Sequence, residues 1–201
     1  MDQHLTIKTQ PAVEPVSKAE VKLALRIDST YSTEDDLLDS YIATARQTLE
    51  IWTNRTFIFT TYIYYLDYNP GGRDSGVIYL PNAPLSTVTS VKYLDSAGSE
   101  QTVAGTVYQA DTAATPGRIY LKYGQSWPTS RDIQKQYYIE YVSGRADAAA
   151  VAAADEWVKM IIKWMVGHFW INREATSTLT LKDLPYGLQA LVWTNKVAIF
   201  T

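Results

Sequence analysis

The chain has 201 residues, which is enough to bury a hydrophobic core without disulfides or metals and fits one domain or two small ones. It has no cysteine, which excludes a disulfide framework, a thiolate zinc site and a cysteine nucleophile. The net charge of −3 disfavours a protein that grips nucleic acid, although a mildly acidic lining would let a duplex slide past. Because no window approaches the ~20 apolar residues of a membrane span, and the first ten residues contain no apolar leader, we expect a soluble protein made in a cytoplasm.

The N-terminal part predicts an extended arm followed by two helices. Residues 1–16 contain two prolines and little periodicity, which is typical of an arm. Ser17 is followed three residues later by Glu20, the spacing of a capping box that begins a short helix. A second helix is expected from Thr33 to about Asn54, since acidic residues follow Thr33 and apolar residues recur at helical spacing.

Residues 56–144 have a different character, with β-branched and aromatic runs separated by turn clusters. They predict an inserted, antiparallel β-rich domain of about six strands. Its first run, residues 57–68, is apolar or aromatic on both faces, so we expect it to be covered on both sides or to present one face to a partner. The segment Asn69-Pro-Gly-Gly-Arg73 lacks the Lys and Ser/Thr spacing of a phosphate-binding loop and predicts a hairpin tip.

The chain then returns to helix. The alanine-rich residues 144–154 lead to Asp155 and Glu156, whose charges favour a helix start, and the apolar pattern after them is the strongest helical signal of the chain. Residues 176–182 are polar, and Pro185 is placed to begin a last short helix. The apolar end, residues 197–201, could form a strand.

These elements predict an α+β fold with four parts. The parts are an extended arm at 1–16, a helical core at 17–55 and 145–175, the inserted β-rich domain at 56–144, and a C-terminal docking segment with a short helix at 176–201. The residues expected in the helical core are Leu38, Ile42, Leu49, Trp52, Ile161, Ile162, Met165 and Phe169.

The sequence offers no convincing catalytic, cofactor or metal site. The only histidines are His4, in the arm, and His168, which we expect to be a packed core or interface residue. Ser126 has the surroundings of a loop, because the second glycine of a nucleophile elbow is missing. The acidic pairs at 35–36 and 155–156 lie at helix starts, where they offset the helix dipole without catalysis. We therefore expect a non-enzymatic protein without a cofactor, whose dispersed arginines serve solvated faces or inter-subunit ion pairs.

Short sequence words in a fixed order extend over nearly the whole chain. They are PVSKAEVK (15–22), LRID (25–28), DDLL (35–38), AR (45–46), LP (80–81), PL (84–85), VTSV (88–91), YLD (93–95), PGRI (116–119), GQSWP (124–128), NRE (172–174) and LPYG (184–187). Each word alone is weak, but together the sequence resembles the head-tail connector (adaptor) family of tailed phages, including its variant with a β insertion. Ala152 departs from the pattern, since the family is expected to place a proline there.

The resemblance implies a virion protein that is assembled in the host cytoplasm and acts at the head-tail interface. A family member would bind beneath the portal protein after DNA packaging, in a ring of itself with twelve copies expected. It would extend the channel through which double-stranded DNA passes without sequence-specific binding, and provide a platform for a downstream head-completion (stopper) or tail protein. The residues hypothesised to dock on the portal are Leu184, Pro185, Tyr186, Leu188, Leu191, Trp193, Val197, Ile199 and Phe200.

Two alternatives belong to other classes of protein. With 15 tyrosines, the chain has aromatics that could stack on sugars in a carbohydrate- or receptor-binding module, unless they face the core or neighbouring subunits, which we favour. A hydrolase with dispersed carboxylates is the third reading, and the scarcity of histidine argues against it. Under each of these readings, the tyrosines and tryptophans are the residues expected to fill the core or to contact a partner.

Overall fold

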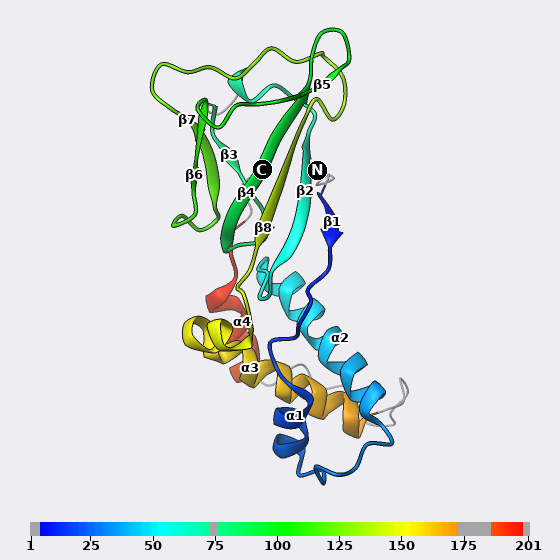
Figure 1. The fold of residues 1–201 in the computed structure, drawn as a ribbon. Coiled ribbons are helices and arrows are strands. Elements are labelled where there is room, and N and C mark those ends of the chain that lie inside the picture. Colours follow the sequence, from blue (N-terminus) through cyan, green and yellow to red (C-terminus); the bar gives the residue numbers. More distant parts are fainter. Residues whose placement is uncertain (1–4, 73–75, 173–185, 199–201) are drawn as a thin grey trace. The chain divides into compact units, whose positions relative to one another are not determined.

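The computed structural model describes residues 5–72, 76–172 and 186–198. The chain divides into two compact units, shown in Figure 1. The helical unit comprises Ala12–Ile58 and Arg145–Lys196. The β unit comprises Phe59–Gly144 together with residues up to Pro11 and from Val197 onward. Helices and antiparallel sheets are both present, so the predicted α+β class is confirmed.

The helical unit contains helices α1–α4, and local sequence signals explain where α1 begins and where α2 ends. The bounds are Lys18–Leu25 for α1, Asp35–Thr53 for α2, Ala148–Ile171 for α3 and Tyr186–Asn195 for α4. The predicted capping box is present, because the Glu20 amide donates to Ser17 Oγ and the Ser17 amide donates to Glu20 Oε2. Helix α2 ends where Asn54 adopts the left-handed conformation, at the predicted position.

Helix α3 consists of two sections that meet at Asp155. The first section is alanine-rich, includes Ala152, and begins at Asp147, whose carboxylate accepts from the Ala150 amide at 2.8 Å. Asp155 has non-helical backbone angles, φ −142° and ψ 56°, and its carboxylate pairs with Arg145 at 2.8 Å. The predicted helix start at residues 155–156 is therefore the start of the second section only.

The β unit contains a five-stranded and a three-stranded antiparallel sheet. The larger sheet has the order β1-β2-β8-β4-β5 and the smaller one β3-β7-β6. The strands are β1 Leu5–Thr9, β2 Thr60–Leu66, β3 Ile78–Tyr79, β4 Leu85–Leu94, β5 Glu100–Thr102, β6 Tyr108–Asp111, β7 Arg118–Leu121 and β8 Tyr137–Ser143. The described part of the insertion thus holds seven strands, one more than predicted. The predicted arm contains an edge strand of the larger sheet, since β1 pairs with β2.

Two predictions for the start of the insertion need correction. Residues 69–72 are not the tip of a hairpin, because the short 3₁₀ helix Pro70–Gly72 connects β2 of the larger sheet to β3 of the smaller one. The run 57–68 is also not one strand, because Phe57 and Ile58 lie in the core of the helical unit. In β2 itself Tyr62 and Leu66 are buried in the β unit, while Ile63 and Tyr65 on the other face are half-buried.

Each unit has its own hydrophobic core. In the helical unit α2 packs along α3, and the expected core residues Leu38, Ile42, Leu49, Ile161, Ile162 and Met165 lie in this core. Trp52 and Phe169 are half-buried and pack against it. In the β unit the core is built on β2, β4, β7 and β8, with Tyr137 and Tyr141 fully buried.

Candidate assembly surfaces

Ser126 and His168 are two of the side chains that the sequence analysis considered for chemistry. Ser126 lies in a loop, next to Trp127, whose buried indole N–H donates to the Gly76 carbonyl at 2.8 Å. His168 is exposed, so the expectation of a packed core residue is wrong and the interface reading stays open.

Within the described ranges, no group of three His, Asp or Glu side chains could hold a metal ion. Nor is any described helix long and apolar enough to cross a membrane.

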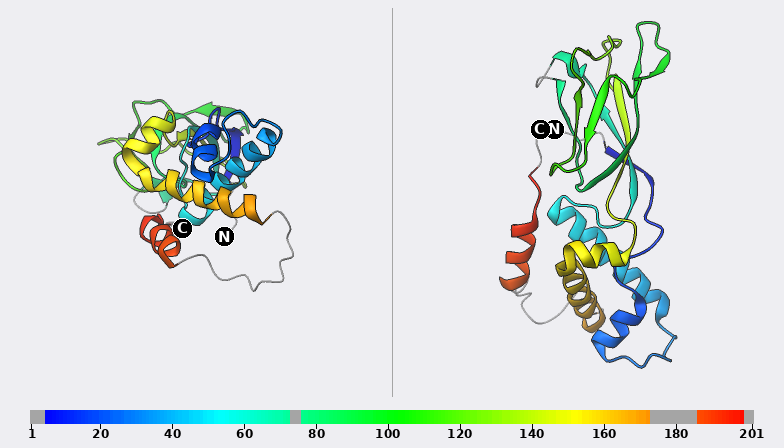
Figure 2. Two further views of the ribbon diagram at one scale, coloured as in Figure 1. Left: turned by 90° about the horizontal axis from the view of Figure 1, so that it is seen from below. Right: turned by 60° about the vertical axis from the view of Figure 1, so that its left-hand side comes forward.

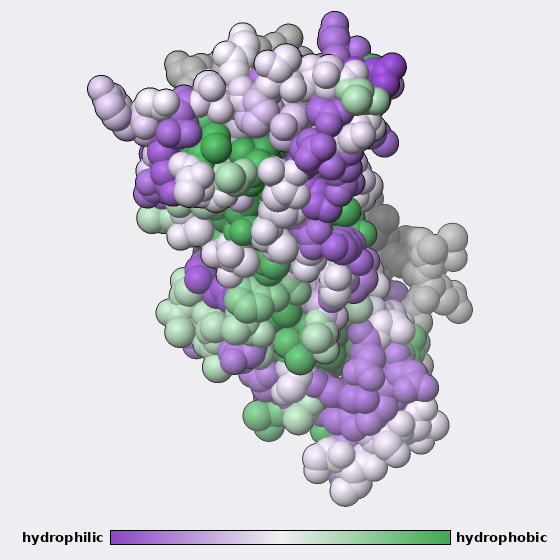
Figure 3. Space-filling view, turned by 45° about the horizontal axis from the view of Figure 1, so that its top comes forward, coloured by the Kyte–Doolittle hydropathy of each residue, from purple (hydrophilic) through white to green (hydrophobic). Residues whose placement is uncertain are grey.

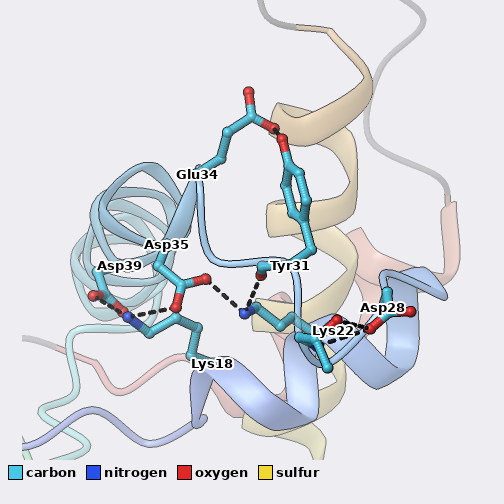
Figure 4. A network of polar contacts seen from close by, with 8 residues as sticks. Lys18, Lys22, Asp28, Tyr31, Glu34, Asp35 and Asp39 are labelled. Carbon is cyan, nitrogen blue, oxygen red and sulfur yellow. Dashed lines mark hydrogen bonds and ion pairs between the residues drawn. The ribbon is translucent and has the colours of Figure 1, made fainter.

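Asp35, at the start of α2, belongs to the polar network drawn in Figure 4. Lys22, with a nearly buried side chain, lies between Asp35, 2.6 Å away, and the carbonyl of Tyr31, also 2.6 Å away. Lys18 contacts Asp35 and Asp39 at 3.5 and 2.8 Å. The hydrogen-bonded ammonium of Lys22 lowers the pKa of the Asp35 carboxyl. The network therefore fixes the connection between α1 and α2, which explains its charges without catalysis.

An open groove lies between α1 and the exposed face of α3. One stripe of α3 contributes Met160, Trp164, Gly167 and Ile171, which helical spacing places on one side. Leu25 of α1 reaches this face because Gly167 has no side chain, and a Cβ there would lie 3.1 Å from Leu25 Cδ2. Trp164 remains 51% exposed and Ile171 78% exposed. In Figure 3 pale green side chains also gather over the alanine-rich first section of the same helix. The groove thus exposes apolar side chains of α3 next to the charged side chains of Glu20, Glu156, Lys159 and Lys163.

Glu20 connects α1 to the charged rim of this groove. Its carboxylate closes the capping box and also pairs with Lys159 at 3.1 Å, with Lys163 3.9 Å away. Partial burial raises the pKa of Glu20, but the hydrogen bonds from the Ser17 amide and from Lys159 outweigh it, so the pKa lies below its ordinary value. The folded state therefore favours the charged carboxylate.

We expect Glu20→Gln to lower the free energy of unfolding by about 0.5–1 kcal/mol at pH 7, because the amide keeps the capping box and loses the ion pair. Glu20→Ala loses both interactions and should cost about 1–2 kcal/mol. Since the folded-state pKa is lowered, wild type gains from this carboxylate above its unfolded-state pKa and loses that gain as the pH falls through the folded-state pKa. Urea titrations at pH 7 and pH 3 measure the difference in the free energy of unfolding between wild type and each variant. A difference between wild type and Glu20→Gln that did not shrink in acid would contradict the ion-pair contribution.

Helix α4 carries the second apolar surface of the helical unit. It is held against α2, because Arg55 donates to the Asn195 carbonyl at 2.7 Å, and Val192 is buried in the helical core. Leu191 packs against the same core, whereas Trp193 is 78% exposed. The exposed indole is the most prominent feature of this helix.

The residues hypothesised to dock on the portal differ in exposure, and the structure describes only some of them. Trp193 is exposed, Leu191 is half-buried and Val197 is buried. Tyr186 and Leu188 lie in the first turn of α4. The remaining four lie outside the described residues: Leu184, Pro185, Ile199 and Phe200. Sequence reasoning missed the stripe of α3, although the i, i+4, i+11 spacing of Met160, Trp164 and Ile171 was available as a signal.

The tyrosines of the β unit mainly build its core. Tyr62 stacks on Tyr141 and Tyr93 on Tyr137, with ring centroids 5.6 and 5.5 Å apart. Burial raises the pKa of the Tyr141 hydroxyl well above its ordinary value, and this hydroxyl donates to the Pro81 carbonyl. Tyr123 is fully exposed. Rings stacked on one another within a core are not available to stack on sugars, so these four give the binding-module alternative no support.

Comparisons with known proteins agree with the resemblance. Residues 19–110 match the model of the family described as phage gp6-like head-tail connector protein. No curated protein matches. Three similar solved chains come from gene transfer agent (GTA) particles. They are from the virion of the native particle (TM-score 0.77, 21% identity), the neck of the empty particle computed with C6 symmetry (0.74, 21%) and the neck of the native particle computed with C12 symmetry (0.66, 19%).

Each of these alignments covers 98% of this chain and 97% of the solved chain. The fold is therefore shared along the whole length, including the β insertion. Through residues 19–110, this chain is similar to the phage gp6-like head-tail connector family.

Proposed function

We propose that the protein is a structural connector in the neck of a tailed phage or a phage-like particle. Copies of it form a ring below the portal, extend the DNA channel and provide the platform for the next connector or tail component. The observation that carries the proposal is the fold shared over 98% of the chain with a protein of a neck computed with C12 symmetry, together with the family match.

The test is the mass of the purified protein alone and mixed with its portal protein, measured by light scattering at matched salt. We expect a stoichiometric ring that forms on the portal, with twelve copies. Equal masses with and without portal, and no ring in either sample, would contradict the connector function. Binding of a glycan by the monomer would favour the carbohydrate-binding alternative.

We also propose that the end of the C-terminal segment makes the portal contact. Ending the chain after Ala198 removes Ile199, Phe200 and Thr201 and leaves every described residue in place. The shortened protein should bind the portal at least about tenfold more weakly, as expected when apolar anchors are lost. Tyr123→Ala is the matched control, since Tyr123 is exposed in the β unit. An unchanged affinity of the shortened protein would remove residues 199–201 from the contact.

A further inference from the structure

The helical unit has two exposed apolar surfaces that lie on opposite sides of α3. One is the groove between α1 and α3, with Met160, Trp164 and Ile171, and the other is the exposed face of α4 around Trp193. In both views of Figure 2, α1 and α4 lie on opposite sides of α3. Exposed aromatic residues of this size are the usual anchors of protein interfaces.

The two surfaces suit each other in shape and chemistry. The groove is concave and presents Met160, Trp164 and Ile171 of α3. On its rim Glu20 pairs with Lys159, and Glu156 and His168 also line it. Helix α4 has the sequence YGLQALVWTN and contains no charged residue, so it would bring no charge of its own into the groove. Ala190 and Trp193, both exposed and three residues apart, present a small and a large side chain on one face.

We propose that the groove of one copy receives the exposed face of α4 of the next copy, with Trp193 packed against Trp164 and Met160. The inference rests on the proposed ring, because a ring needs two different surfaces that face opposite ways, so that each copy contacts two neighbours. A chain cannot fill its own groove in this way, because its α4 is held on the other side of α3 by Val192 and Arg55. Contacts with further copies can therefore cover both the groove and the exposed face of α4 of one chain.

The decisive experiment uses Trp164→Glu, which disables the groove, and Trp193→Glu, which disables the α4 face. Each variant alone should lose ring formation under conditions in which wild type forms the ring. An equimolar mixture should form a 1:1 dimer and nothing larger, because the intact groove of one variant can bind the intact α4 of the other. Native mass spectrometry and light scattering measure the masses. Ile51→Glu is the matched control, because Ile51 is 75% exposed on α2 outside both surfaces, and this variant should form the ring.

The outcomes separate this inference from the function on which it rests. If wild type forms no ring with or without portal, the proposed function fails first. If wild type forms the ring and either single variant forms it too, or if the mixture stays monomeric, the pairing of groove and α4 is wrong while the connector function stands. Because both tryptophans are exposed, circular dichroism should show folded variants.

A second measurement does not depend on charge insertion. The chain has no cysteine, so a Met160→Cys, Ala190→Cys double variant can only form disulfides between the two introduced thiols. We expect oxidation of the assembled ring to give a ladder of covalent multimers. With Ile51→Cys in place of Ala190→Cys the ladder should disappear. Equal ladders from both variants, or none from either, would contradict the proposed contact.

Discussion

Replacing Ile162 by alanine is expected to lower the free energy of unfolding by about 2–5 kcal/mol, because a fully buried isoleucine is lost from the interface between α2 and α3. Ile162 has no exposed surface and belongs to the same core as Leu38 and Leu49 of α2. Removing three carbons there leaves a cavity that two packed helices can close only in part. Denaturant titration followed by far-UV circular dichroism measures the loss.

Ile171→Ala is the matched control for this change. It removes the same atoms from the same helix at a position that is 78% exposed, so the free energy of unfolding should stay within about 0.5 kcal/mol of wild type. Trp170 is half-buried against the core, and its replacement by alanine should fall between the two. Equal effects at positions 162 and 171 would contradict the orientation of α3 described here.

The second large effect is expected for Gly117→Ala in the β unit. A Cβ at this position would lie 2.3 Å from Leu85 Cβ and 2.7 Å from Leu85 Cδ2. Rotation of the Leu85 side chain cannot relieve the first of these contacts, so the backbone must move. Gly117 also accepts the hydrogen bond of the Leu80 amide, 2.8 Å away, which a backbone shift would disturb. We expect a loss of about 3 kcal/mol, at the upper end of what overpacking costs.

Gly105→Ala provides the comparison, because no atom beyond its two chain neighbours lies within 4 Å of the Cβ that it would add. It should change the free energy of unfolding by less than about 0.5 kcal/mol. Near-ultraviolet circular dichroism reports the stacked tyrosines of the β unit and can follow its unfolding for both variants. If Gly117→Ala were as stable as Gly105→Ala, the close approach of Gly117 to Leu85 would be wrong.

The sequence predicts those elements whose limits are set by neighbours along the chain. The capping box of Ser17 and Glu20 and the left-handed Asn54 are local features, and the start of α1 and the end of α2 follow from them. Strand β1 is different, because its partner β2 lies more than fifty residues later, and nothing local distinguishes it from an extended arm. The prediction of a hairpin at residues 69–72 is wrong for the same reason. Whether this segment joins two paired strands depends on strand pairing between distant parts of the chain, and here β2 and β3 belong to different sheets.

The candidate surfaces were harder to predict, because helix α3 is apolar on nearly all sides. In such a helix the apolar pattern indicates burial but not which residues stay exposed. The packing of α2 and α1 decides that Ile161 is buried and Trp164 exposed. For α4 the core buries Val192 and leaves Trp193 outside, one residue further along the chain. Exposure here is a tertiary property, and a list of apolar residues could not separate anchors from core.

The interleaving of the two units has a consequence for synthesis on the ribosome. All strands of the larger sheet are translated once Ser143 has been added, so this sheet can form while the chain is still growing. Helix α2 must wait longer, since α3, which covers its apolar side, ends only at Ile171. At about 5–20 residues per second, the apolar side of α2 stays uncovered for on the order of ten seconds. The β insertion therefore lengthens the time for which the apolar side of α2 stays exposed during synthesis.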